Sequence, residues 1–261
     1  MEYESMLAET VHMRGHQNDL INAYVARPLG AGPFPGVVLL HYNAGWDEWQ
    51  KEFGRRLAHH GYVTIVPNLH FREGKATAEE NAKSFLASGG AYRVTDHEIG
   101  DVQGAIDYLR ELPYLNGRIG VVGYCSGGRL AYLGACTLRG IDAVVCCYPG
   151  GVVPKADESS PNEPDICCPP ETARRQRAPI DYTKDLQCPM LGLFGADDKQ
   201  PSLADMAKME EELKRFGKTY QFHAYENAGH VFFSTNRKEY RAHAAVDGWN
   251  RVFDWFGKYL R

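Results

Sequence analysis

A cysteine enclosed by glycines is the residue of this chain best placed to act as a nucleophile. The motif Gly-Tyr-Cys-Ser-Gly-Gly spans 123–128, between an apolar run over 119–124 and a helical pattern that begins at Leu130. This order is typical of a nucleophile elbow, a sharp strand-to-helix turn that exposes the nucleophile. Side chains two residues before and after the nucleophile would clash in such a turn, and both positions are glycine. A helix N-terminus beside the sulfur would also favour the thiolate, so the motif predicts Cys125 as a covalent nucleophile.

Ser126 is the alternative nucleophile in the same motif. The residue two positions before it is Tyr124 and not glycine, so the elbow pattern fits Cys125 better. We expect Ser126 to contribute its backbone N–H to an oxyanion instead. A purely structural cysteine at a tight turn, without chemistry, stays open from this motif alone.

A carboxylate and a histidine follow the cysteine in the order of a hydrolytic triad. Gly-Ala-Asp-Asp at 195–198 ends one apolar run, and Asn-Ala-Gly-His at 227–230 follows another. The gaps from Cys125 to Asp198 and from Asp198 to His230 are 73 and 32 residues. Nucleophile, acid and histidine occur in this order in α/β-hydrolases. We expect Asp198 to orient the imidazole of His230, with Asp197 as the neighbouring alternative.

The elements that must position these residues are read from the apolar pattern. Eight short strands are predicted, at 10–13, 20–27, 36–41, 63–67, 119–124, 143–148, 190–195 and 220–225. The first two are expected to form a hairpin around 15–19, and the others alternate with helical patterns. Capping-box signals predict helix starts at Thr77, Thr95 and Ser202. Such alternation predicts an α/β fold with a mainly parallel central sheet and helices on both faces.

One domain is expected over 1–261, with one segment that does not fit a short connection. The stretch 149–187 contains seven prolines and clusters of charged residues. It is too long for a routine loop, so a lid or binding loop and an irregular excursion both remain open.

With these motifs in place, the chain resembles the dienelactone hydrolase family (carboxymethylenebutenolidase-like proteins) of the α/β-hydrolases. The resemblance runs from about Gly36 to the C-terminus, and Gly-Tyr-Cys-Ser-Gly-Gly is its most specific motif. It implies an α/β-hydrolase fold without a cofactor, with Cys125 as nucleophile, His230 as general base and acid, and Asp198 as the orienting carboxylate. The implied oxyanion hole consists of the backbone N–H groups of Ser126 and Asn43.

The sequence departs from the family pattern at the substrate-binding positions. Founding members carry a Glu after the first parallel strand that helps to activate the Cys, and Tyr42 stands there in this chain. They also hold a substrate carboxylate with two arginines. One lies four residues after the histidine, where this chain has Ser234 and, three residues further, Arg237. Lys83 and Arg93 are the candidates for the other position. Tyr42, Trp46, Phe71 and Phe232 would suit an apolar or aromatic substrate, and simple packing of these aromatic side chains stays open as the alternative.

These residues predict a carboxylic ester hydrolase that acts on a small-molecule ester or lactone through a thioester on Cys125. A broad-specificity esterase that also accepts phosphotriesters is an alternative, because the anion-anchoring positions are altered. A ligand receptor built on a hydrolase scaffold is a third interpretation, since a fold alone does not determine function.

Composition excludes several other classes. The chain has 261 residues, a formal net charge of −4 and 44% hydrophobic residues, so neither nucleic-acid binding nor membrane insertion is expected. Neither a metal-ligand spacing nor a phosphate-binding glycine motif occurs, so we expect no metal and no nucleotide cofactor. Seven cysteines without a disulfide pattern favour a reducing cytoplasm. A monomer or a homodimer is expected.

Overall fold

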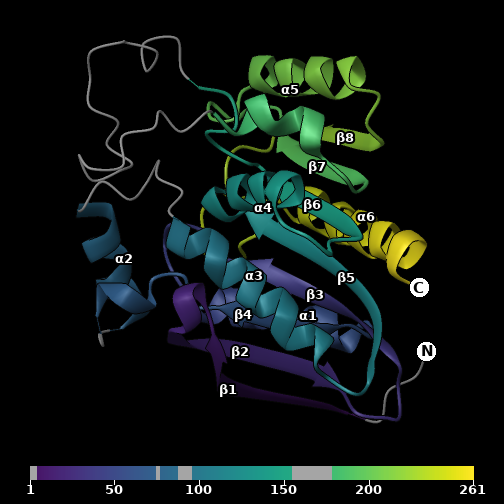
Figure 1. Cartoon of the computed structure of the whole chain (residues 1–261). Helices are drawn as coiled ribbons and strands as arrows, with labels where there is room; N and C mark the ends of the chain where they lie inside the picture. Colours follow the sequence, from purple (N-terminus) through teal and green to yellow (C-terminus); the bar gives the residue numbers. More distant parts are fainter. Residues whose placement is uncertain (1–4, 75–76, 88–95, 155–177) are drawn as a thin grey trace.

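An eight-stranded sheet forms the centre of the computed structural model, which describes residues 5–74, 77–87, 96–154 and 178–261 (Figure 1). The strand order is β1-β2-β4-β3-β5-β6-β7-β8. The neighbouring strands β4, β3, β5, β6, β7 and β8 all run parallel to one another. In contrast, β2 is antiparallel to both of its neighbours, β4 and β1. The strands are β1 Met6–Arg14, β2 Leu20–Pro28, β3 Phe34–Leu40, β4 Val63–Pro67, β5 Leu115–Tyr124, β6 Ala143–Cys147, β7 Met190–Gly195 and β8 Tyr220–Tyr225.

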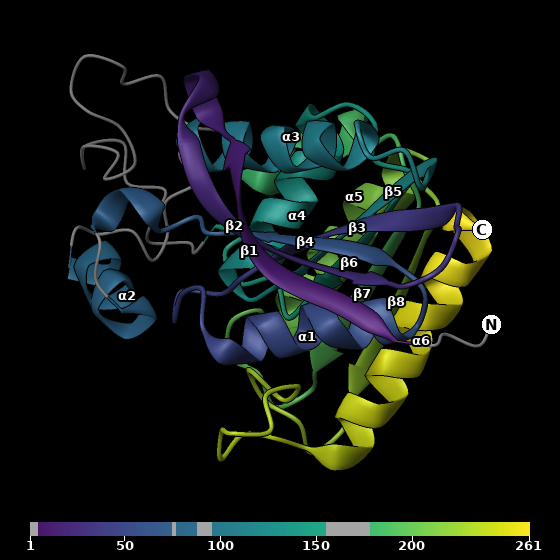
Figure 2. The same ribbon diagram turned by 90° about the horizontal axis from the view of Figure 1, so that it is seen from below.

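Helices cover both faces of this sheet, as the view in Figure 2 shows. Buried side chains of α3, α4 and α5 pack on one face, and those of α1 and α6 pack on the other. The helix α2 lies away from these two layers. The helices are α1 Glu48–His59, α2 Ala78–Ala87, α3 Asp96–Arg110, α4 Ser126–Thr137, α5 Leu203–Arg215 and α6 Ala242–Leu260, with short 3-10 helices η1 His16–Asn18, η2 Phe71–Glu73 and η5 Pro179–Asp185.

The strand β3 shows why the sheet is buried on both sides. Val38 and Leu40 belong to the cluster under α3 and α4, and Val37 and Leu39 to the cluster under α1 and α6. All four side chains are fully buried. A strand covered on both faces reads as a continuous apolar run, which is how the sequence displays it. The α/β-hydrolase fold predicted from the sequence is confirmed.

The predicted strands are all present, with corrections at their ends. The strand β5 begins at Leu115 and not at 119, because an irregular stretch with Gly117 at φ +86° joins the pairing with β3. The strand β3 ends at Leu40, so His41 lies beyond it. The helix α4 begins at Ser126, directly after the cysteine, and not at Leu130.

Two of the three predicted helix starts have the expected side-chain bonds. The Ser202 hydroxyl accepts the Asp205 N–H, and the Asp205 carboxylate accepts the Ser202 N–H. Thr77 and Glu80 make the same reciprocal pair before α2. Thr95 lies outside the described residues, as does most of the 149–187 segment, of which 155–177 are not described. Within the described chain, no helix combines the length and apolarity needed to cross a membrane.

Candidate active site

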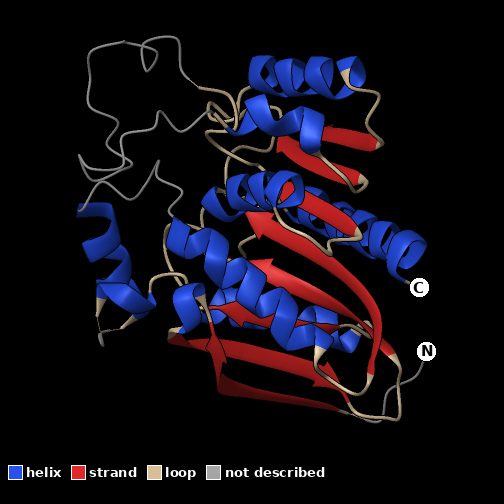
Figure 3. Ribbon diagram, in the orientation of Figure 1, coloured by secondary structure: helices blue, strands red, loops and turns tan. Residues whose placement is uncertain are grey.

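The three predicted triad residues come from three neighbouring regions at one edge of the sheet. Cys125 follows β5, Asp198 follows β7, and His230 lies in the loop after β8. The carboxyl ends of parallel strands meet at a single edge, toward which the arrows of β3 and β5 point in Figure 3. Ligand sites of open parallel sheets lie at this edge.

The backbone at Cys125 has the strained geometry of a nucleophile elbow. Its φ and ψ are +55° and −117°, and it occupies the N-cap position of α4. Its N–H donates to the Cys147 carbonyl of β6 at 3.0 Å, which fixes the turn against the neighbouring strand. The side chain is partly exposed and its thiol is free. A positive φ at a non-glycine residue costs about 1–3 kcal/mol and persists where the surrounding structure enforces it.

The flanking glycines are required by close backbone contacts. A Cβ at Gly123 would lie 2.0 Å from the Gly127 carbonyl oxygen, and a Cβ at Gly127 would lie 2.2 Å from that of Leu40. Both distances are far inside van der Waals contact, so the start of α4 fits against β5 and β3 only without side chains at these positions. The predicted reason for the two glycines is confirmed.

His230 is held by Asp198 and not by Asp197. The Nδ1 of His230 lies 2.7 Å from Oδ2 of Asp198, whose other oxygen accepts the Gln200 N–H at 2.9 Å. The Asp198 side chain is buried, whereas Asp197 is exposed. Because Nδ1 is occupied by the carboxylate, Nε2 is the nitrogen that faces the Cys125 thiol, to which His230 also hydrogen-bonds.

Backbone contacts bring the acid loop and the histidine loop together. The Asp197 N–H donates to the Ala228 carbonyl, and the Ala196 N–H donates to that of Tyr225, both at 2.9 Å. A Cβ at Gly195 would lie 2.4 Å from the Ala228 oxygen. The glycine at the end of β7 therefore lets the two loops approach closely enough for the carboxylate to reach the imidazole.

The surroundings of His230 favour its protonated form. Burial alone would lower its pKa, but hydrogen bonds to Asp198 and Cys125, together with their negative charges, outweigh burial and raise the pKa to about 10. Tyr148 is fully buried and its ring centroid lies 5.0 Å from that of His230. The arrangement can hold an imidazolium, with the Tyr148 ring packed against it at an interplanar angle of 59°.

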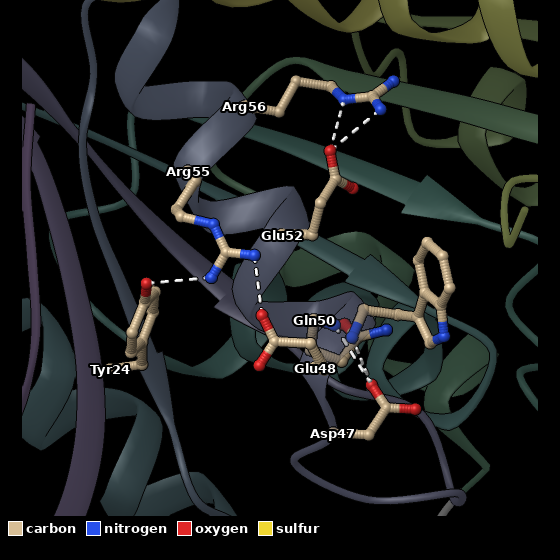
Figure 4. A network of polar contacts seen from close by, with 8 residues as sticks. Tyr24, Asp47, Glu48, Gln50, Glu52, Arg55 and Arg56 are labelled. Atoms are coloured by element: carbon tan, nitrogen blue, oxygen red, sulfur yellow. Dashed lines mark hydrogen bonds and ion pairs between the residues drawn. The ribbon is translucent and has the colours of Figure 1, made fainter.

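The two expected oxyanion donors come from the start of α4 and from the turn that follows β3. Ser126 is the first residue of α4, so its N–H is among those that have no partner within the helix. Asn43 lies in the turn between β3 and α1. This turn is fixed at its end by Asp47, whose Oδ1 accepts the N–H groups of Trp49 and Gln50 at 3.1 Å (Figure 4).

Tyr42 interacts with both Asp47 and Arg237. Its hydroxyl donates to Oδ2 of Asp47 at 2.5 Å and accepts a hydrogen bond from the Arg237 guanidinium. Burial, the first cause, and the Asp47 carboxylate raise the pKa of Tyr42 far above its usual value. The phenol is therefore a neutral donor, and the exposed Arg237 has a carboxylate nearby.

The other expected substrate contacts have different positions in the structure. Trp46 is half-buried, donates its indole N–H to the Val66 carbonyl at 2.9 Å and lies under the Lys51 ammonium. Phe232 has no exposed surface and packs between Tyr148 and Tyr225, so it is a core residue in this structure. Ser234 is also fully buried, Lys83 is exposed on α2, and Arg93 lies outside the described residues.

Sequence reasoning missed two residues of this region. Tyr148 was expected to end a strand, but it lies beyond β6 with φ +37° and packs on His230. His41 was expected inside a strand, and its role emerges from contacts with residues distant in sequence. The sequence around neither residue signals its role, because the contacts of both are made with residues on neighbouring strands.

Among the described residues, no group of three or more His, Cys, Asp or Glu side chains could hold a metal ion.

A family model described as "Dienelactone hydrolase family" matches residues 21–260 of the chain. A "Putative carboxymethylenebutenolidase" from Methylorubrum extorquens is 32% identical over 245 residues, which cover 93% of this chain and 78% of the relative. A "Carboxymethylenebutenolidase" from Pseudomonas putida is 28% identical, with 92% of each chain covered. The crystal structure of a "Putative Dienelactone Hydrolase" from Klebsiella pneumoniae matches with a TM-score of 0.81 and 27% identity over 98% of this chain and 100% of that chain.

Proposed function

This chain belongs to the dienelactone hydrolase family, and we propose that it hydrolyses carboxylic esters or lactones through a thioester on Cys125. The observation that carries the proposal is the contact of one imidazole, His230, with a buried carboxylate and with a thiol on a strained elbow. The proposed setting is a reducing cytoplasm, where the thiol stays free. The reaction uses a small molecule and water as its only reactants.

In the first half of the proposed reaction, the Cys125 proton resides on His230 and the thiolate attacks the substrate carbonyl. The oxygen of the tetrahedral intermediate accepts the N–H groups of Ser126 and Asn43. Such donors contribute about 3–4 kcal/mol each to stabilising the transition state. His230 then gives its proton to the leaving alkoxide as the C–O bond breaks, which leaves a thioester.

In the second half, the loss of the thiolate charge converts His230 from an acid into a base. Two of the effects that raise its pKa come from Cys125, and both disappear when the sulfur is acylated. Burial then lowers the pKa with only Asp198 opposing it. The neutral imidazole can take a proton from water as the water attacks the thioester, and collapse of the second intermediate releases the acid and restores the thiol.

The substrate of this reaction is proposed to be uncharged near Arg237. The Asp47 carboxylate acts on the same Tyr42 hydroxyl as the Arg237 guanidinium, so the positive charge at this point is compensated. An arginine that binds a substrate carboxylate would need a positive charge that no nearby carboxylate of the protein compensates. This observation favours the second candidate, a broader esterase for neutral esters, over a hydrolase restricted to an anionic dienelactone.

A substrate panel tests this function. Wild type and Cys125→Ala are compared on a p-nitrophenyl ester series and on a dienelactone, with release of nitrophenol and loss of dienelactone absorbance as readouts. We expect turnover by wild type and none above background by Cys125→Ala. Ligand binding without turnover in both proteins would instead support a receptor.

A further inference from the structure

His41 links the ends of two strands through both nitrogens of its ring. Its Nδ1 lies 2.9 Å from the Tyr42 carbonyl oxygen, and its Nε2 lies 3.0 Å from the Leu69 backbone nitrogen. A carbonyl can only accept, so Nδ1 carries the proton and Nε2 accepts the Leu69 N–H. Leu69 follows β4 and Tyr42 follows β3, so one buried side chain joins the two strand ends.

The surroundings of His41 keep this tautomer neutral. Its side chain is 2% exposed, and burial lowers its pKa to about 4, although the Tyr42 carbonyl partly offsets that effect. The edge of the ring packs against His70, with 4.6 Å between the ring centroids, and His70 stacks on Phe85 of α2 at 4.1 Å. The Nε2 acceptor is therefore available at neutral pH.

The backbone of the same residue touches the start of the catalytic helix. A Cβ at Gly127 would lie 2.6 Å from the His41 carbonyl oxygen, so the first turn of α4 packs directly on this residue. The residues that line a small cavity beside this contact include His41 and His70 as well as Ser126 and Gly127 at the start of α4. His41 thus lies close to both proposed oxyanion donors, because Asn43 is two residues along the chain and Ser126 lines the same cavity.

We propose that His41 is a positioning residue of the oxyanion hole, which holds the Asn43 turn in register with Ser126 through the Leu69 N–H···Nε2 bond. The proposal rests on the proposed function, because it presupposes an oxyanion at these two amides. Loss of the bridge would leave the turn attached to α1 through Asp47 and to β4 through the bond from the Trp46 indole N–H to the Val66 carbonyl. Its first residues, next to Asn43, would lose their bond to Leu69. The Asn43 end of the turn would then no longer be held against the segment that follows β4, so the distance between the two donors would be less well fixed.

A matched pair of variants tests the bridge. The side-chain oxygen of Gln in His41→Gln can occupy the place of Nε2 and accept the Leu69 N–H, whereas that of Asn in His41→Asn is one carbon too short. With p-nitrophenyl acetate as substrate, we expect kcat to fall at least tenfold in His41→Asn, with KM within about threefold of wild type, and to be largely restored in His41→Gln. Loss of a single oxyanion donor typically costs about 10²–10³ in kcat, which is the upper bound for a misplaced one.

Alkylation of Cys125 by iodoacetamide separates this role from general damage to the site. The displacement of iodide forms no tetrahedral oxyanion, so the alkylation rate of His41→Asn should equal that of wild type. His70→Phe, which keeps the stack on Phe85, serves as the control and should retain wild-type kcat. Unchanged kcat in His41→Asn, equal losses in the Asn and Gln variants, or a parallel loss of alkylation would overturn the proposal. Absence of ester hydrolysis and of an acyl adduct in wild type would instead contradict the proposed function, and this proposal with it.

Discussion

The Nδ1 of His230 lies 2.7 Å from the Oδ2 of Asp198, although the two residues belong to loops that follow different strands. The close approach depends on Gly195, where a side chain would strike the backbone of the histidine loop. The carboxylate is buried and also accepts a backbone N–H, so its position is fixed independently of the histidine. The imidazole is therefore oriented before any substrate binds.

Removal of the Asp198 charge should lower activity strongly. Asp198→Asn keeps the shape of the side chain but offers an amide to Nδ1, which disfavours the tautomer with its proton there. We expect kcat for p-nitrophenyl acetate to fall by roughly 10³-fold or more, by analogy with the same change in serine hydrolase triads. Asp197→Asn, at the exposed neighbouring position, is the matched control and should retain wild-type kcat. Equal rates in the two variants would show that the carboxylate does not serve His230.

The pKa of His230 should depend on Cys125. In wild type it is raised to about 10 by Asp198 and Cys125 acting against burial. Cys125→Ala removes the effects of the thiol, and burial persists, so the pKa must decrease; the imidazole then loses its proton at lower pH than in wild type. NMR titration of the His230 ring protons measures both values. An unchanged pKa in Cys125→Ala would contradict an imidazolium–thiolate pair.

The glycine two residues after the cysteine should be essential to stability. Gly127→Ala would place a Cβ 2.2 Å from the Leu40 carbonyl oxygen, and overpacking of this kind costs about 1–3 kcal/mol or more. Gly134→Ala lies in the same helix, α4, where the new Cβ would contact only Leu138 at 3.5 Å. It should be neutral or stabilising by up to about 1 kcal/mol, since Ala is the better helix former. Urea unfolding compares the two, and similar free energies of unfolding would argue against the close contact at the elbow.

The charge of Asp47 should control the preference between neutral and anionic esters. Asp47→Asn preserves a good N-cap for α1 but removes the carboxylate that shares Tyr42 with Arg237. At pH 8 we expect KM for a p-nitrophenyl ester with a terminal carboxylate to fall severalfold, with less effect at high salt, while KM for the acetate stays constant. Glu48→Gln, whose charge is paired with Arg55 on the same helix, is the control. If both substrates respond equally, Arg237 does not face the substrate.

The sheet, and the approach of Asp198 to His230 at the edge where Cys125 lies, were predictable because their signals are local. A buried parallel strand is a short apolar run, and the glycines at 123 and 127 follow from the geometry of the turn itself. Asp198 and His230 each follow such a run, so the fold brings them to the edge where Cys125 lies. The strand 63–67, predicted from Val63 to Pro67, has these bounds in the structure.

The surroundings of the triad were not predictable, because they depend on side-chain direction and on pairs distant in sequence. Phe232, two residues after the histidine, was expected to meet the substrate, but it points into the core. The His41 bridge requires Leu69, 28 residues away, and the link from Tyr42 to Arg237 spans most of the chain. The spacing of apolar residues along the sequence does not predict such contacts, because they form only when the fold brings the strand ends together.

The most direct test of the account is to trap the acyl group on the cysteine. Wild type is mixed with p-nitrophenyl acetate, quenched in acid within milliseconds to seconds, and examined by intact-mass and peptide mass spectrometry, with Cys125→Ala treated in parallel. We predict a mass increase of one acetyl group on the peptide that contains Cys125, formed and lost at rates that account for turnover, and no such adduct in Cys125→Ala. Turnover without an adduct on this peptide, or equal turnover by the two proteins, would contradict covalent catalysis by Cys125.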